Sequence, residues 1–333
     1  MVIKKKLKRV LIILFVSAGV ILLAFKLSPY PSVWIIRYAF DKEADKVNRE
    51  LAIQVPDSIK SIENVQYDPG DGDAYMDAYI QPEAVRSGKR LPVIVWTHGG
   101  GLISGNKGQL ANYCKILASR GYVVISIDYT IAPGGKYPKP IQQLNSALAY
   151  ISANAEKFNA DTSFFVLAGD SGGSMISAAA ANVITSTSYA QITNVQPVLN
   201  PDQLKGLLLY CGIYEIDNLN TEGAFGSFLK TVTWAYFGTK NISNDKYAKT
   251  ASVTNFLTGK FPPTFISAGN NDPLLNQSKI LAEKLSTLNV PIDTLFYPKN
   301  HEPALGHEYQ FKLDSAGKIA LERSSSFLRM IAE

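Results

Sequence analysis

The apolar and polar positions of this chain form three different patterns. Val10–Phe25 is an apolar run without a charged residue. Further along, short apolar runs of strand length alternate with longer stretches of helical periodicity. These patterns predict strands at 62–67, 74–80, 91–97, 122–127, 163–168, 204–210, 264–268 and 292–297, and helices at 110–119, 140–154, 172–185, 277–288 and 315–331.

The alternation of strands and helices predicts an α/β fold over residues 63–333. Runs such as LPVIVWT at 91–97 are apolar throughout, which is typical of strands buried on both faces. We therefore expect a mostly parallel central sheet with helices on both faces. Residues 212–262 break the alternation and are rich in aromatic, Gly and Asn residues, which favours an inserted cap.

The N-terminal apolar run predicts a membrane address. Residues 1–9 form a basic tip, and residues 10–27 are expected to be a transmembrane signal-anchor of about 24 Å or slightly more. Positive charges stay in the cytoplasm, so the catalytic domain is expected outside it, on a single-pass cell-membrane protein. The alternative is secretion after signal cleavage. Ser17 and Gly19 have the required spacing, but they lie inside the apolar run.

Residues 28–62 read as a helical linker or cap segment. An amphipathic helix with Val33, Ile36 and Phe40 on one side is expected here. It could lie on the membrane surface or over the domain.

Charge and cysteine content exclude several classes of protein. The chain has 33 Lys and Arg against 28 Asp and Glu, and the net charge of +5 equals the five cations of the basic tip. The rest of the chain is neutral, so no nucleic-acid partner is expected. Cys114 and Cys211 are isolated, which excludes a disulfide framework and a structural zinc site. We expect no metal and no organic cofactor.

Residues 169–173 carry the first chemical motif. Gly169, Asp170, Ser171, Gly172 and Gly173 follow a predicted strand and open a predicted helix. This matches the G-x-S-x-G nucleophile elbow, in which glycines permit a tight turn that exposes the serine hydroxyl.

The second motif is His98, Gly99, Gly100 and Gly101, directly after the strand that ends at Thr97. Consecutive glycines leave backbone N–H groups accessible, which suits an oxyanion hole. A phosphate-binding loop is the alternative, but the GK[ST] ending is absent. His98 is expected to brace this loop.

An acid and a base are expected after the serine. Asp272 follows the predicted strand 264–268, where a triad carboxylate belongs, although an Asp before Pro is also a common turn. His301 and His307 are the remaining histidines. We favour His307 because the closing helix follows it, while the spacing from Asp272 favours His301.

Together these motifs resemble the hormone-sensitive-lipase-like group of α/β-hydrolases, a family of carboxylesterases and lipases. The resemblance covers roughly residues 90–331 and includes HGGG at 98–101, GDSGG at 169–173, DPL at 272–274 and Asp128–Pro133. It implies Ser171 as nucleophile, Asp272 as orienting acid, His307 as base, and the N–H groups of Gly100, Gly101 and Gly172 as oxyanion donors. Gly172 stands where that family usually has Ala.

The resemblance implies a serine hydrolase that cleaves carboxylic esters through a Ser-His-Asp triad and an acyl-enzyme. An acyltransferase or amidase with the same triad at the cell envelope is the alternative, and a catalytically silent binding protein is a third. The partners expected are a small-molecule or lipid-like ester and, through the N-terminal helix, the membrane. Aromatic residues of the cap, such as Trp234 and Phe228, either line an apolar acyl pocket or hold the cap to the core.

Overall fold

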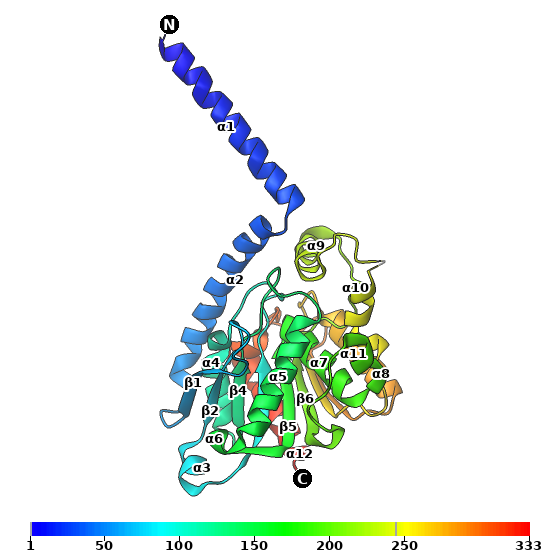
Figure 1. Ribbon diagram of the computed structural model, residues 1–333. Helices are drawn as coiled ribbons and strands as arrows, with labels where there is room; N and C mark the ends of the chain where they lie inside the picture. Colours follow the sequence, from blue (N-terminus) through cyan, green and yellow to red (C-terminus); the bar gives the residue numbers. More distant parts are fainter. Residues whose placement is uncertain (1, 244) are drawn as a thin grey trace.

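The computed structural model describes residues 2–243 and 245–333, with side chains from residue 5 onward, so part of the predicted basic tip lies outside the described residues. The chain opens with two long helices, α1 (Val2–Leu27) and α2 (Tyr30–Leu51) (Figure 1). Helix α1 projects away from the rest of the molecule. Within it, Lys5–Leu27 is long and apolar enough to cross a membrane. The most apolar 18-residue stretch of this segment has a mean hydropathy of 2.7, and none of that stretch is buried.

An eight-stranded sheet in the order β1-β2-β4-β3-β5-β6-β7-β8 forms the centre of the fold. Strand β2 is antiparallel to its neighbours β1 and β4, and every pair from β4 to β8 is parallel. The strands are β1 (Lys60–Gln66), β2 (Tyr75–Ile80), β3 (Leu91–Thr97), β4 (Val123–Ile127), β5 (Ala160–Asp170), β6 (Leu204–Tyr210), β7 (Thr264–Ala268) and β8 (Ile292–Phe296).

Helices cover both faces of the sheet. Strand β3 shows why, because Val93 and Val95 pack into one buried cluster and Ile94 and Trp96 into the other. Helices α5 (Lys139–Ala153), α7 (Ser171–Thr185) and α11 (Leu275–Thr287) contribute to the first cluster, and α4 (Ala111–Ala118) and α12 (Ser315–Met330) to the second. The predicted α/β class, with a mostly parallel sheet between helices, is confirmed.

The sequence did not predict the short helices α3 (Pro82–Ser87), α6 (Ala155–Phe158) and α8 (Thr187–Thr193). Short 3-10 turns occupy 52–54, 107–110, 201–203, 253–255 and 309–311. The predicted boundary at residues 62 and 63 falls inside β1, which pairs with β2 from Lys60 onward. The α/β domain therefore begins before residue 63, because the edge strand belongs to its sheet.

Residues 212–262 carry helices α9 (Gly223–Phe237) and α10 (Lys246–Ala251), and Asn244 of this segment lies outside the described residues. Helix α9 lies across from α2 at the end of the molecule from which α1 departs (Figure 1). The α2–α9 approach includes the rings of Phe40 and Phe228, whose centroids are 5.5 Å apart.

Candidate active site

Ser171 lies at the junction between β5 and α7. Its φ of 48° is a left-handed conformation, which places the residue on a sharp turn. Two flanking glycines make the turn possible. A Cβ on Gly169 would lie 2.6 Å from the carbonyl carbon of Gly173, and one on Gly173 would clash with the carbonyl oxygen of Thr97. The helix and strand therefore approach each other more closely than any other residue type allows.

His307 bridges Ser171 and Asp272. Its Nε2 lies 3.0 Å from the Ser171 Oγ, and its Nδ1 lies 3.0 Å from the Asp272 Oδ2. The other Asp272 oxygen accepts a hydrogen bond from the Leu274 N–H at 2.7 Å, which fixes the carboxylate. His301 instead packs its ring against Tyr297 at 4.4 Å. Three residues from distant parts of the sequence thus form one hydrogen-bonded line.

The pKa of His307 is raised well above its usual value. Burial opposes the charged form, but the adjacent Cys211 sulfur, the hydrogen bond to Asp272 and, to a smaller extent, the nearby Glu308 carboxylate together outweigh it. Glu308 Oε1 lies 3.6 Å from His307 Nε2. An imidazole in this environment accepts a proton readily and holds it as an ion pair.

The glycine run at 98–101 lies beside the serine. Gly100 and Gly101 have φ values of 85° and 61°, and a Cβ on Gly100 would collide with the backbone of Ser104. Among the residues that the structure describes, no acceptor takes the N–H of Gly100 or Gly101. These two donors are available to a bound group.

His98 packs inside this loop. Its ring stacks on Tyr129 with centroids 4.3 Å apart, and its Nδ1 lies 3.0 Å from the Gly99 carbonyl oxygen. Burial lowers its pKa to about 4, so the ring is neutral at physiological pH. The Tyr129 hydroxyl donates to the carbonyl oxygens of His98 and Gly99, at 3.0 and 3.2 Å.

Leu102 occupies the space beside Gly172. A Cβ on Gly172 would lie 3.0 Å from the Leu102 Cδ2 and 3.1 Å from its backbone nitrogen. Leu102 is 3% exposed and has a φ of 64°. The side chain of Leu102 therefore packs against Gly172 and takes up space that a methyl group at residue 172 would need.

Sequence reasoning named Asp170 as part of the 169–173 motif but not its contacts, and it missed the roles of Glu308 and Arg37. Asp170 is buried, accepts a hydrogen bond from Trp96 Nε1 at 2.8 Å, and has its pKa raised by burial and by Glu308. Glu308 adjoins His307 in the sequence, but only the folded chain shows which atoms it faces. Arg37 on α2 contacts the loop after the glycine run, and no local motif marks it.

Cys211 lies close to His307 and Asp272, and the three side chains present possible ligand atoms within 4.8 Å of one another. Both ring nitrogens of His307 already face Ser171 and Asp272. Burial raises the pKa of the Cys211 thiol to about 12, which disfavours the thiolate that metals bind. The cluster fits a hydrogen-bonded array better than a metal centre.

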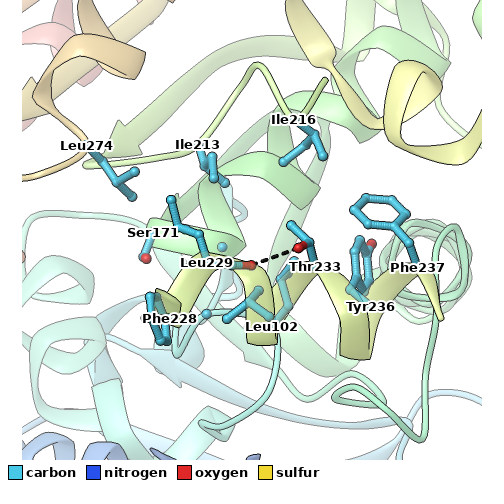
Figure 2. A pocket seen from close by; sticks show the side chains of 13 residues that line it. Leu102, Ser171, Ile213, Ile216, Phe228, Leu229, Thr233, Tyr236, Phe237 and Leu274 are labelled. Carbon is cyan, nitrogen blue, oxygen red and sulfur yellow. Dashed lines mark hydrogen bonds between the residues drawn. The ribbon is translucent and has the colours of Figure 1, made fainter. Parts of the chain in front are cut away.

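Two cavities meet at Ser171. The small pocket has a volume of about 30 Å³ and is lined mainly by apolar side chains, including Leu102, Ile213, Ile216, Leu229 and Leu274 (Figure 2). The large cleft has a volume of about 990 Å³ and is lined by α2, α9, the glycine run and His307.

The fold is shared with solved esterases. Esterase B from Lactobacillus rhamnosus is 21% identical, with a TM-score of 0.75 over 91% of this chain and 96% of that one. The Pyrobaculum calidifontis esterase is 20% identical, with a TM-score of 0.69 over 90% and 93%. The carboxylesterase EstE1, cloned from a metagenomic library, is 17% identical, with a TM-score of 0.69 over 93% and 99%.

A family model described as BD-FAE matches residues 76–285, which is more than half of the 333-residue chain. The matched stretch contains the glycine run, Ser171 and Asp272, and it ends before His307. The α/β-hydrolase esterase class predicted from the motifs is confirmed. The chain belongs to the BD-FAE family, an α/β-hydrolase esterase family.

Proposed function

We propose that this protein hydrolyses carboxylic esters with Ser171 as nucleophile, His307 as general base and Asp272 as orienting acid. The line of two 3.0 Å contacts through His307 is the observation that carries the proposal. A serine hydroxyl is a weak nucleophile unless an adjacent base takes its proton. The names of the structural relatives, all esterases, agree with this assignment.

The reaction proceeds in two halves. Ser171 Oγ attacks the ester carbonyl while its proton passes to His307 Nε2, and Asp272 stabilises the imidazolium. The carbonyl oxygen becomes an oxyanion, bound by the N–H groups of Gly100, Gly101 and Gly172. His307 then protonates the departing alcohol, which leaves an acyl-enzyme on Ser171. Water, deprotonated by His307, releases the acid in the same way.

We also propose that the protein is a single-pass membrane protein with the catalytic domain outside the cytoplasm. The apolar helix Lys5–Leu27 and the cations that precede its apolar part support this topology. A protease added to intact cells should remove the catalytic domain. Detection of the catalytic domain in the culture medium of untreated cells would instead indicate that the N-terminal segment is cleaved.

Hydrolysis of p-nitrophenyl acetate and butyrate by the full chain tests the catalytic assignment. Ser171→Ala and His307→Ala should each lower kcat by roughly 10³–10⁶-fold. His301→Ala is the matched control and should retain activity. Loss of activity in His301→Ala with retention in His307→Ala would move the base, and no hydrolysis by the folded wild-type chain would reject the function.

A further inference from the structure

The two cavities at Ser171 differ in one respect that has a chemical consequence. Ser171 lines both, but His307 lines only the large cleft. In the proposed reaction His307 protonates the departing alcohol, so the alcohol oxygen must lie on the side of His307. The large cleft therefore holds the alcohol portion of the ester, and the small pocket holds the acyl portion.

The size of the small pocket limits the acyl group. A cavity of about 10–15 Å³ holds one water-sized group. The small pocket, at about 30 Å³, therefore holds two or three such groups. The side chains around it are fixed by burial, since Ile213, Ile216 and Leu229 are 8%, 2% and 5% exposed. An acyl chain of about two to four carbons fits there, and a long one does not.

The large cleft, in contrast, has the volume of a site for a large ligand. Its walls between α2 and α9 are mainly apolar and include Ile35, Ile36, Ala39, Phe40, Phe225 and Phe228. The cleft reaches Phe25, in the last turns of the apolar helix α1. On the cap side, the Lys240 ammonium donates to the Lys26 carbonyl oxygen at 2.6 Å, so the cap also borders the end of α1.

The outward face of α2 is aromatic near the anchor and charged further along the helix. Tyr30, Trp34 and Tyr38 are 47%, 65% and 74% exposed and lie four residues apart on one side of the helix. From Tyr30 to Tyr38 they extend about 12 Å along the helix axis, starting just after the anchor. Further along, this side carries charged residues, among them Lys42, Asp45 and Arg49. Exposed aromatic residues next to a membrane span, followed by charges, are typical of a helix that leaves the bilayer interface for water.

We propose that the substrate is an ester between a short acyl group and a large apolar alcohol that resides in the bilayer, and that it enters the large cleft from the membrane surface between α2 and α9. This inference rests on the proposed ester hydrolysis. The cleft begins at the anchor, where Phe25 lines it, and ends at Ser171, so an alcohol can keep one end in the membrane while its ester reaches the nucleophile.

A pair of isomeric esters tests the assignment of the two cavities. Hexadecyl acetate and ethyl hexadecanoate have the same composition, but their long chains lie on opposite sides of the ester. The full chain is reconstituted in phosphatidylcholine vesicles that contain one or the other. We expect hydrolysis of hexadecyl acetate to be at least about tenfold faster. Equal rates, or faster hydrolysis of ethyl hexadecanoate, would overturn the proposal.

Two variants probe the two cavities separately. Leu229→Ala should raise the rate on hexadecyl hexanoate relative to hexadecyl acetate, whereas Leu219→Ala, outside the small pocket, should leave this ratio unchanged. Ala39→Trp should lower the rate on hexadecyl acetate relative to phenyl acetate by about tenfold or more. Lys42→Trp on the exposed side of α2 is its matched control. The assignment is contradicted if Leu229→Ala leaves the ratio of hexadecyl hexanoate to hexadecyl acetate hydrolysis unchanged and Ala39→Trp leaves the ratio of hexadecyl acetate to phenyl acetate hydrolysis unchanged.

Access from the membrane is tested with two vesicle populations. Hexadecyl acetate is placed either in the vesicles that carry the protein or in separate vesicles at the same total concentration. Because the anchor concentrates the protein at its own bilayer, the first arrangement should be at least about tenfold faster at early times. Equal initial rates would contradict entry from the membrane.

Phenyl acetate, a water-soluble ester with a short acyl group, separates this inference from the proposed function. If wild type hydrolyses phenyl acetate, Ser171→Ala does not, and hexadecyl acetate is not preferred, then the substrate inference fails and ester hydrolysis stands. If the folded wild-type protein hydrolyses none of phenyl acetate, hexadecyl acetate and ethyl hexadecanoate, both are rejected.

Discussion

The guanidinium of Arg37 donates a hydrogen bond from Nε to the carbonyl oxygen of Ile103, at 2.7 Å. A second bond from the same side chain reaches the Ala132 carbonyl oxygen at 3.1 Å. One turn later on α2, an Asp41 oxygen accepts from the Gly105 N–H at 3.1 Å. The helix that follows the anchor is thereby joined to the loop after the glycine run.

Replacing Arg37 should loosen that loop. Arg37→Met leaves two carbonyl oxygens without their charged donor, which should lower the free energy of unfolding by about 1–3 kcal/mol. If α2 also positions the loop that carries the oxyanion donors, kcat should fall by about tenfold. Urea unfolding and p-nitrophenyl acetate turnover measure the two effects. Arg49→Met, at an exposed position of the same helix, is the control. Equal behaviour of the two variants would show that the contact is dispensable.

The pH dependence of the reaction should reflect the negative charge of Glu308. The base must be neutral to take the Ser171 proton, so activity rises with pH through the pKa of His307. The Glu308 carboxylate helps to raise that pKa. Glu308→Gln should therefore lower it and move the acidic limb of the kcat/KM profile to lower pH. Glu302→Gln, at an exposed position near His301, should leave the limb in place. A shift to higher pH in Glu308→Gln would contradict the assignment.

Leu102 and Gly172 should behave as a coupled pair. Gly172→Ala places a methyl group 3.0 Å from the Leu102 Cδ2, which pushes Leu102 and the adjacent donors out of position. We expect kcat to fall about tenfold. Leu102→Ala in the same chain should restore part of the loss, because it frees the space that the methyl needs. The double-mutant cycle measures this coupling. Gly72→Ala, where a Cβ meets nothing within 4 Å, should be neutral. Additive effects of the two substitutions would disprove the contact.

Trp34 should lie at the bilayer surface in the full chain. In a Trp234→Phe background, lipids brominated near the head group should quench its fluorescence, whereas Trp96, which is fully buried, should be unaffected. Trp34→Phe should remove most of the quenched emission. If quenching persists undiminished in Trp34→Phe, the aromatic side of α2 does not face the lipid.

Much of the fold could be predicted because it follows from local patterns. Strands at 91–97, 204–210 and 264–268 were predicted with the bounds of β3, β6 and β7. Each is a short run of apolar residues that the chain can bury only inside a parallel sheet. The short helices α3 and α8 were missed, because six or seven residues carry too little periodicity to distinguish them from loops.

By itself the sequence determined the chemical components of the site. Glycines on either side of Ser171 and in the run 98–101 mark places where the backbone turns sharply, since only glycine tolerates that geometry. The apolar run 10–25 is also a local feature. Its length and composition alone indicate a candidate membrane span, without reference to distant residues.

Only the tertiary structure decided how these components combine. Sequence spacing left His301 and His307 as alternatives, and the path of the loop after β8 brings His307 to Ser171 and Asp272. The division into a small pocket and a large cleft arises because α2, from one end of the chain, faces α9, inserted some 170 residues later. Such contacts depend on how separate elements pack against one another, and no local pattern of residues encodes them.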